Sequence, residues 1–490
     1  MNLPPDLKTA ADSIAEVARS YGLDFFDTVF EMISFEEVNE VAAYGGFPIR
    51  YPHWRFGMEY ERLSKGYTYG LSRIYELVIN NNPCYAYLLD TNSIVDQKLV
   101  MAHVYAHCDF FKNNVYFART NRRMIDQMAN HGARFRRYVE RYGFEKVESF
   151  LDAVLSIENL IDPNAAFVEH ARAAGEEEEL ALQPVHKMPS KEYMDSFVNP
   201  QEFLDEQRRR IEEDQERRKR FPEQPERDVL WFLMEHAPLD RWQRDVIGMI
   251  REEAIYFLPQ AQTKIMNEGW ASYWHSRIMT ERVLSDAEVI EYADHCASVF
   301  SMRPGTFNPY KVGLELWRDI ERRWDRGQFG KEWEECDSYE EKSRWDRKTG
   351  LGQKEIFEIR QLYNDVTFID TFLTADFCND NKLFVYKYNE NTRRHEISDR
   401  DFDKIKAQLL WSLTNMGQPI IRVEDANHEN RGILLLMHDH QGVDLDIAYA
   451  NGTLQNLQKI WGRPVSVETV IDGKPKLLTH DGELYKEQVL

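Results

Sequence analysis

Apolar residues recur at helical spacing over most of the chain before residue 345. The first such stretch covers residues 7–35, where Ile14, Val17, Ala18 and Tyr21 form one stripe. The same periodicity predicts further helices over residues 59–85, 93–111, 120–142, 144–160, 226–237, 239–257, 260–280, 285–301, 309–327 and 332–344. We therefore expect a large helical body.

The pattern changes after residue 353, where short segments are rich in β-branched and aromatic residues. Strands are predicted over residues 366–372, 382–388, 419–424, 432–438 and 443–449, and helices over 399–415 and 454–461. A terminal hairpin is predicted for residues 465–471 and 474–479, with its turn at Asp472-Gly473. These elements indicate a small α+β domain at the C-terminus.

Composition separates the helical body into two parts. Residues 162–200 hold few large apolar side chains and the run Glu176–Glu179, and residues 202–220 are almost all charged. The charged helix is either a solvated helix with many i,i+4 ion pairs or a docking surface for a partner. We expect a mainly α fold with four parts: residues 1–160 and 226–350 of a zincin-like helical body, a charged linker at 161–225, and an α+β domain at 355–490.

Charge and cysteine usage narrow the class of protein. The 490 residues include 61 basic and 83 acidic side chains, a net charge of −22, which argues against nucleic-acid binding and against adhesion to an anionic membrane. The longest apolar runs are too short to span a bilayer. Five widely spaced cysteines without a Cys-x-x-Cys pair, and no visible signal peptide, favour the cytoplasm.

The first candidate for chemistry is a histidine pair. His103 and His107 lie four residues apart in a helical pattern, so their rings project from one face and can reach one metal ion. This is the geometry of the His-Glu-x-x-His helix of zinc peptidases, but Val104 stands where that motif has its general base. The alternative is a pair of buried histidines held by backbone groups or carboxylates.

A second helix completes a ligand set. Glu268 and His275 lie seven residues apart on one face, and Glu268-Gly-Trp-Ala271 resembles the segment that carries the third ligand in gluzincin peptidases. His103, His107 and Glu268 would then bind zinc or another divalent transition metal and leave a fourth position open.

Other residues have candidate roles around that metal. His275 is either a fourth ligand, which would close the site, or a catalytic group that moves a proton in place of the missing glutamate. Asp109 orients a histidine, binds the metal or takes part in catalysis, or else is an exposed carboxylate at a helix end.

Candidate substrate-binding residues lie in two regions. Asn113 and Asn114 are helix caps or substrate hydrogen-bonding groups, and Trp270 adjoins the proposed ligand Glu268. The loop over residues 44–54 could line a groove for carbohydrate or peptide, or pack over the helical body. The loop residues concerned are Arg50, Tyr51, His53 and Trp54.

Several separated motifs also share one resemblance. They are Arg50-Tyr-Pro-His-Trp54, Val78-Ile-Asn80 with Asn82-Pro83, His103-x-x-x-His107, Phe110-Phe-Lys-Asn-Asn114, Asn267-Glu-Gly-Trp-Ala271 with Trp274-His275, Asn308-Pro-Tyr310 and Trp461-Gly-Arg-Pro464. Together they resemble the SpoVR (stage V sporulation protein R) family. The resemblance implies a role in spore cortex formation, hence peptidoglycan, or in stationary-phase stress. It also implies a PrkA-type serine kinase and a von Willebrand-type protein as partners, but no reaction.

Two functional hypotheses follow. The first is a metal-dependent hydrolase of amide or peptide-like bonds, with the metal held by His103, His107 and Glu268. The second is a non-catalytic metal-binding scaffold or regulatory protein with a degenerate peptidase-like core. The complete ligand set favours the first, and Val104 favours the second.

Overall fold

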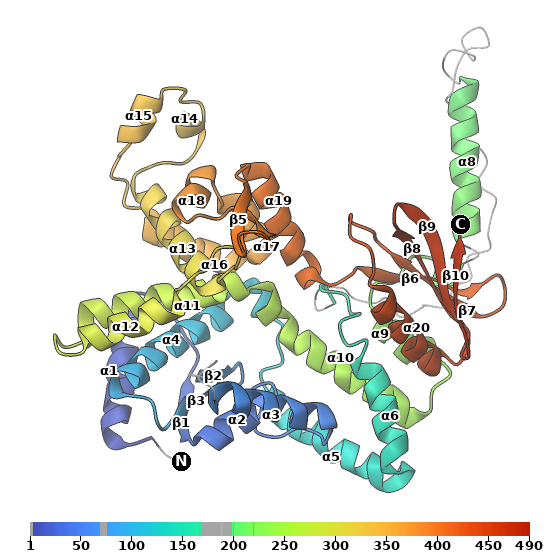
Figure 1. Ribbon diagram of the computed structural model, residues 1–490, viewed down its shortest axis with the longest axis horizontal. Helices are drawn as coiled ribbons and strands as arrows, with labels where there is room; N and C mark the ends of the chain where they lie inside the picture. The colour runs from blue at the N-terminus through green and yellow to red at the C-terminus, as the bar shows by residue number, and fades with distance from the viewer. Residues whose placement is uncertain are drawn as a thin grey trace. The chain divides into compact units, whose positions relative to one another are not determined.

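The computed structural model describes residues 3–68, 76–165 and 200–490 except residue 219, together with Phe167, Met188 and Val198. The fold is mainly helical, with a five-stranded sheet near the C-terminus (Figure 1). Two compact units divide it: Met1–Arg141 with Tyr256–Gly417, and Tyr142–Ile255 with Gln418–Leu490. The predicted linker residues Glu176–Glu179 lie outside the described residues.

The first unit begins with one helix and a small sheet. Helix α1 (Pro5–Ser20) is followed by β1 (Thr28–Ile33), which pairs in parallel with β3 (Cys84–Leu89). Strand β2 (Glu76–Ile79) lies antiparallel on the other side of β3. The prediction of helix over residues 28–33 and 76–85 was therefore wrong, because backbone pairing among these short apolar segments takes the place of local helical bonds.

Two buried helices form the centre of this unit. Helix α4 (Ile94–Asn113) begins at Ser93, whose side chain accepts the backbone N–H of Asp96 at 3.1 Å. Helix α11 (Lys264–Ile278) packs against α4 on one side and against α13 (Pro309–Asp325) on another (Figure 1). Residues on nearly every side of α4 and α11 are buried, so both helices lie inside the core.

The contact between α11 and α13 is close enough to require glycine on both helices. A Cβ atom placed on Gly269 would lie 2.4 Å from the carbonyl carbon of Gly313, and one on Gly313 would lie 2.2 Å from the carbonyl oxygen of Ile265. The glycine of the Glu-Gly-Trp-Ala segment therefore has a packing role: it lets the two helices touch.

The remaining elements of the first unit surround these helices. Residues 355–417, assigned by the sequence to the C-terminal domain, pack here because Ile356, Ile359 and Phe368 are buried in its core. The elements are α2 (Phe35–Ala43), α3 (Trp54–Thr68), α5 (Met124–Tyr142), α12 (Val289–Val299), α14 (Lys331–Glu334), α15 (Tyr339–Arg344), α16 (Gly352–Leu362), α17 (Asp365–Phe372), α18 (Ala375–Asp380), α19 (Phe402–Leu413) and the hairpin of β4 (Val385–Asn389) and β5 (Arg394–Asp399).

Helix α17 occupies a segment predicted as a strand. Asn364 and Thr367 form a reciprocal capping box at its start, and Phe368 and Phe372, four residues apart, are both buried. The strand prediction for residues 366–372 was wrong because a short apolar run fits either element, and the cap decides between them.

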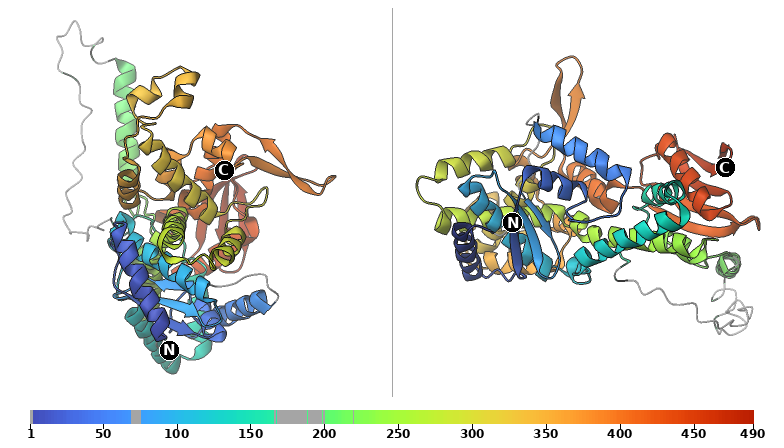
Figure 2. Two further views of the ribbon diagram at one scale, coloured as in Figure 1. Left: turned by 90° about the vertical axis from the view of Figure 1, so that its left-hand side faces the viewer. Right: turned by 90° about the horizontal axis from the view of Figure 1, so that it is seen from below.

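The second unit carries the larger sheet, drawn in orange-red to red in Figure 2. Its strands lie in the order β10-β9-β8-β7-β6. Strands β7 and β8 are parallel and the other neighbours are antiparallel. Its elements are α6 (Phe144–Leu155), α8 (Gln201–Arg218), α9 (Val229–His236), β6 (Ile421–His428), β7 (Ile433–His438), α20 (Ile447–Trp461), β8 (Val465–Ile471), β9 (Lys474–His480) and β10 (Tyr485–Val489). Helix α10 (Arg241–Gln262) continues from this unit into the first.

The terminal hairpin is confirmed, with Asp472 and Gly473 both at positive φ between β8 and β9. The charged segment predicted as a helix is α8. The strand prediction for residues 443–449 was wrong, because Asp446 caps α20 by accepting the backbone N–H groups of Ala448 and Tyr449. Among the described residues, no helix is both long and apolar enough to cross a membrane.

We predict that Gly269→Ala lowers the free energy of unfolding by about 1–3 kcal/mol or more, because the added methyl group overlaps the α13 backbone. Urea denaturation measures the change. Gly57→Ala is the matched control, because this glycine lies in α3 with nothing within 4 Å of the added Cβ. This substitution should raise the free energy of unfolding by roughly 0.5–1 kcal/mol. Equal effects at the two positions would contradict the packing role.

Candidate metal centre

Helix α4 presents two histidines on one face. His103 and His107 are one helical turn apart and only 5% and 4% exposed, respectively. Their ring centroids are 4.5 Å apart. Because both imidazoles are buried in the protein core, each ring needs polar partners.

Helix α11 brings a carboxylate to the same point. Oε2 of Glu268 lies 3.6 Å from Nε2 of His103 and 3.5 Å from Nε2 of His107. The ligand atoms of all three residues lie within 4.8 Å of one another, the one such group of three or more His, Cys, Asp and Glu found in the described part of the chain. The side chain of Glu268 is 19% exposed as a whole, but its Oε2 atom and Nε2 of His103 are buried.

The two separations between Glu268 and the histidines match what a metal would require. Ligand atoms about 2.0–2.1 Å from a tetrahedral zinc ion are roughly 3.4 Å from one another. Oε2 of Glu268 has no hydrogen-bond partner among the described residues. Burial favours the protonated acid, but the two imidazoles outweigh it and hold the pKa of Glu268 below its ordinary value. The residues present therefore fit a divalent transition metal.

Neighbouring side chains orient both imidazoles. Nδ1 of His107 lies 2.8 Å from Oδ1 of Asn267, and because an amide oxygen only accepts, Nδ1 carries the proton and Nε2 keeps its lone pair. Nδ1 of His103 lies 2.9 Å from Nδ1 of His275. For His103 Nε2 to bind a metal, its Nδ1 must donate to His275, which leaves the proton of His275 on Nε2.

His275 is therefore placed behind His103 rather than beside the open position. It is 4% exposed, and its ring stacks at 6.2 Å on Phe300. Burial, together with the nearby His103, holds the pKa of His275 well below its ordinary value, so the ring is neutral. With Nδ1 accepting from His103, His275 can donate a proton from Nε2 but cannot accept one there.

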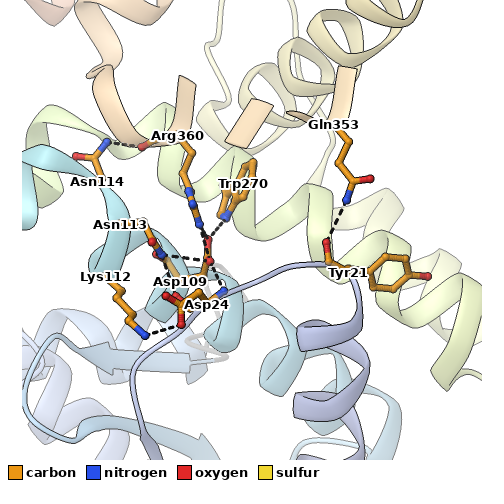
Figure 3. Close-up of polar contacts among 9 residues, drawn as sticks. All are labelled: Tyr21, Asp24, Asp109, Lys112, Asn113, Asn114, Trp270, Gln353 and Arg360. Atoms are coloured by element: carbon orange, nitrogen blue, oxygen red, sulfur yellow. Dashed lines mark hydrogen bonds and ion pairs between the residues drawn. The ribbon is translucent and has the colours of Figure 1, made fainter. Parts of the chain in front are cut away.

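Asp109, two residues after His107 on α4, binds partners outside the cluster (Figure 3). Its carboxylate accepts three hydrogen bonds: from Nη1 of Arg360 at 2.6 Å, from the indole N–H of Trp270 at 2.9 Å and from the backbone N–H of Asp24 at 2.8 Å. Asp109 is 0% exposed, so the alternative of an exposed carboxylate at a helix end was wrong.

The proposed substrate-binding residues of the two helices have structural partners. Trp270 is 0% exposed and packs among core aromatic rings, with an edge-to-face contact to Trp317 at 5.1 Å between ring centroids. The side-chain amide of Asn113 donates to the backbone carbonyl of Asp24 at 2.8 Å (Figure 3). Asn114 donates to the carbonyl of Arg360 at 2.8 Å and accepts the N–H of Tyr116, as a cap does.

The aromatic loop packs over the helical body. Tyr51 is 1% exposed, with its ring 4.4 Å from that of Phe135, and the Arg50 guanidinium lies 4.9 Å from the ring centroid of Phe56. His53 is also buried, whereas Trp54 is 53% exposed. Of the four predicted loop residues, Trp54 is the one with a large exposed ring.

Three residues of the site were not predicted from sequence. Asn267 orients His107, and Tyr310 stacks on the ring of His103 at 6.4 Å. Asp365 accepts the backbone N–H groups of Ile265 and Met266 in the first turn of α11, one turn before Glu268. The signal for Asn267 was its place directly before Glu268, and Tyr310 lies in Asn308-Pro-Tyr310.

Fold and site together define a mainly helical protein with a candidate two-histidine, one-glutamate metal centre between two buried helices. Residues 3–418 match the family described as SpoVR like protein, and residues 419–472 match the SpoVR-like C-terminal domain. The chain belongs to the SpoVR family, as its motifs predicted.

A curated relative supports this membership. The uncharacterized protein YcgB of Escherichia coli K12 is 30% identical over 485 residues, which cover 93% of this chain and 90% of that protein. No solved structure matches the chain. The chemistry of the site therefore has to be argued from its own residues.

We predict that Asp365 makes stability pH-dependent. Burial raises the pKa of Asp365 to about 7, although the backbone N–H groups of Ile265 and Met266 oppose the shift. In the unfolded chain the pKa of an aspartate is near 4. Between about pH 4 and 7 the folded chain therefore holds a proton on Asp365 that the unfolded chain has lost, so the free energy of unfolding falls as pH rises through this range.

Asp365→Asn removes this titration. The unfolding free energy of the parent chain relative to Asp365→Asn should fall by up to about 4 kcal/mol across that window. Urea denaturation at a series of pH values measures the difference. A difference that rises with pH would show that the folded state favours the carboxylate.

Proposed function

We propose that this chain binds one divalent transition metal, with zinc the first candidate, through Nε2 of His103 and His107 and a carboxylate oxygen of Glu268. The observation that carries the proposal is the convergence of these three ligand atoms, within 4.8 Å of one another, from two buried helices. Two histidines and a carboxylate with one open position form the ligand set of catalytic zinc sites in a zincin-like arrangement.

The proposed activity is hydrolysis of an amide or peptide-like bond. A metal held there would polarise the scissile carbonyl and lower the pKa of a bound water. The chain would supply orientation, with Asn267 fixing His107 and His275 fixing His103.

The family context gives the proposed substrate and partners. The SpoVR name links the activity to peptidoglycan of the spore cortex or to stationary-phase stress, in the cytoplasm. The kinase and von Willebrand-type partners would belong to the same module. The five cysteines are free thiols, as that location requires.

The second candidate function is a non-catalytic metal-binding scaffold that works with a PrkA-type kinase. Two observations favour it. Val104 replaces the glutamate that serves as general base in zinc peptidases. Nδ1 of His275, 2.9 Å from Nδ1 of His103, is occupied as an acceptor when His103 binds a metal, so His275 does not replace that base.

We predict that the purified chain binds about one equivalent of Zn²⁺ and that His103→Ala or Glu268→Ala weakens binding at least about 100-fold, since each removes a ligand. Zinc titration against a competing chelator measures the affinity. The matched control is His438→Ala, another buried histidine, which bonds Thr469 in the second unit and should leave zinc affinity unchanged. Full affinity in both ligand variants would refute the site.

A second experiment separates the two functions. If the chain is a hydrolase, the zinc-loaded protein cleaves peptide-linked peptidoglycan fragments, chelation abolishes cleavage, and restored Zn²⁺ recovers it. Mass spectrometry of the fragments gives the bond that is cut. Binding of one Zn²⁺ without cleavage of any fragment, while the chain still associates with a PrkA-type kinase, would favour the scaffold.

A further inference from the structure

The two proposed ligand helices are joined at a second point besides the metal cluster. Asp109 follows His107 by two residues on α4, and Trp270 follows Glu268 by two residues on α11. Two residues correspond to about 200° around a helix, so Asp109 and Trp270 leave their helices on nearly the opposite side from the ligands. They meet each other there, with the Trp270 Nε1 2.9 Å from Oδ2 of Asp109.

Arg360 of α16 fixes this second junction. Its Nη1 lies 2.6 Å from each carboxylate oxygen of Asp109, and its guanidinium carbon lies 5.5 Å from the ring centroid of Trp270. The backbone N–H of Asp24, between α1 and β1, donates to the same carboxylate at 2.8 Å (Figure 3). Four segments distant in sequence therefore converge on one buried carboxylate.

Burial makes this junction rigid. Asp109 and Trp270 are 0% exposed and Arg360 is 4% exposed. Withdrawing one partner would leave a charge or an indole N–H in a medium that solvates it poorly, so the network resists relative movement of the helices. A metal site tolerates only about 0.2 Å of error in its ligand distances, and the spacing of α4 and α11 sets those distances.

We infer that the Asp109–Trp270–Arg360 network positions α4 against α11 and thereby sets the metal affinity of the His103, His107 and Glu268 cluster. This inference rests on the proposed metal site. Asp109 is then a positioning residue rather than a catalytic one, and α16 becomes a required support of the site.

Arg360→Met tests the inference against a matched control. Arg251→Met removes the cation that pairs with another buried carboxylate: Nη2 of Arg251, 18% exposed, lies 2.7 Å from Oδ2 of the 0% exposed Asp228, in the unit without the cluster. Both variants leave a buried carboxylate without its cation, so both should lower the melting temperature. We expect only Arg360→Met to raise the Zn²⁺ dissociation constant of the folded chain, by roughly 10- to 100-fold.

Two further measurements keep the test decisive if Arg360→Met does not fold. Trp270→Phe keeps a buried ring but removes the hydrogen bond between the helices, and it should also weaken Zn²⁺ binding about 10-fold. The visible absorption spectrum of bound Co²⁺ should change in the folded variants, because it reports ligand geometry. Unchanged Zn²⁺ affinity in folded Arg360→Met or Trp270→Phe would overturn the inference, whereas absence of Zn²⁺ binding by the parent chain would overturn the proposed function instead.

Discussion

The close packing of α11 determines where the candidate site lies. A single atom added at Gly269 would overlap the backbone of Gly313, so α11 sits directly on α13. Its other side packs against α4, and the two helices share one core with α16 and α17. Because α11 is enclosed in this way, the side chains of Asn267 and Glu268 lie against α4, where they face His107 and His103.

Polar groups inside such a core persist only in satisfied sets. The network around Asp109 is one such set, and Asp365, which caps the first turn of α11, closes another. In the cluster of His103, His107 and Glu268, Oε2 of Glu268 has no hydrogen-bond partner among the described residues, and the proposed metal would satisfy it. Each set joins helices that are distant in sequence, so the buried polar residues give the apolar helices a defined alignment that hydrophobic contact alone would not provide.

The three cluster residues could be predicted from sequence because their signals lie within short segments. These signals are the i,i+4 spacing of His103 and His107 and the resemblance of Glu268-Gly-Trp-Ala271 to a gluzincin ligand segment. The sequence predicted β8 and β9 for the same reason, since Asp472-Gly473 is a local turn signal. It did not predict β1, β2 or β3, whose partners lie far apart along the chain. Nor did it show that Asp109 would meet Arg360, a contact across 251 positions that only the packed helices create.

The proton arrangement of the cluster bears on its chemistry. A metal on Nε2 of His103 requires Nδ1–H, which donates to His275 and leaves that ring with a proton on Nε2. His275 then offers a donor beside the rings of Tyr292 and Phe300. Val104 stands at the position of the usual base, so among His103, His275 and Glu268 only the Glu268 carboxylate would remain as a proton acceptor once His103 holds a metal. As a proposed ligand, that carboxylate would already be engaged by the metal. The chain's own groups are therefore better suited to holding a metal and polarising a bound carbonyl than to removing a proton from an attacking water.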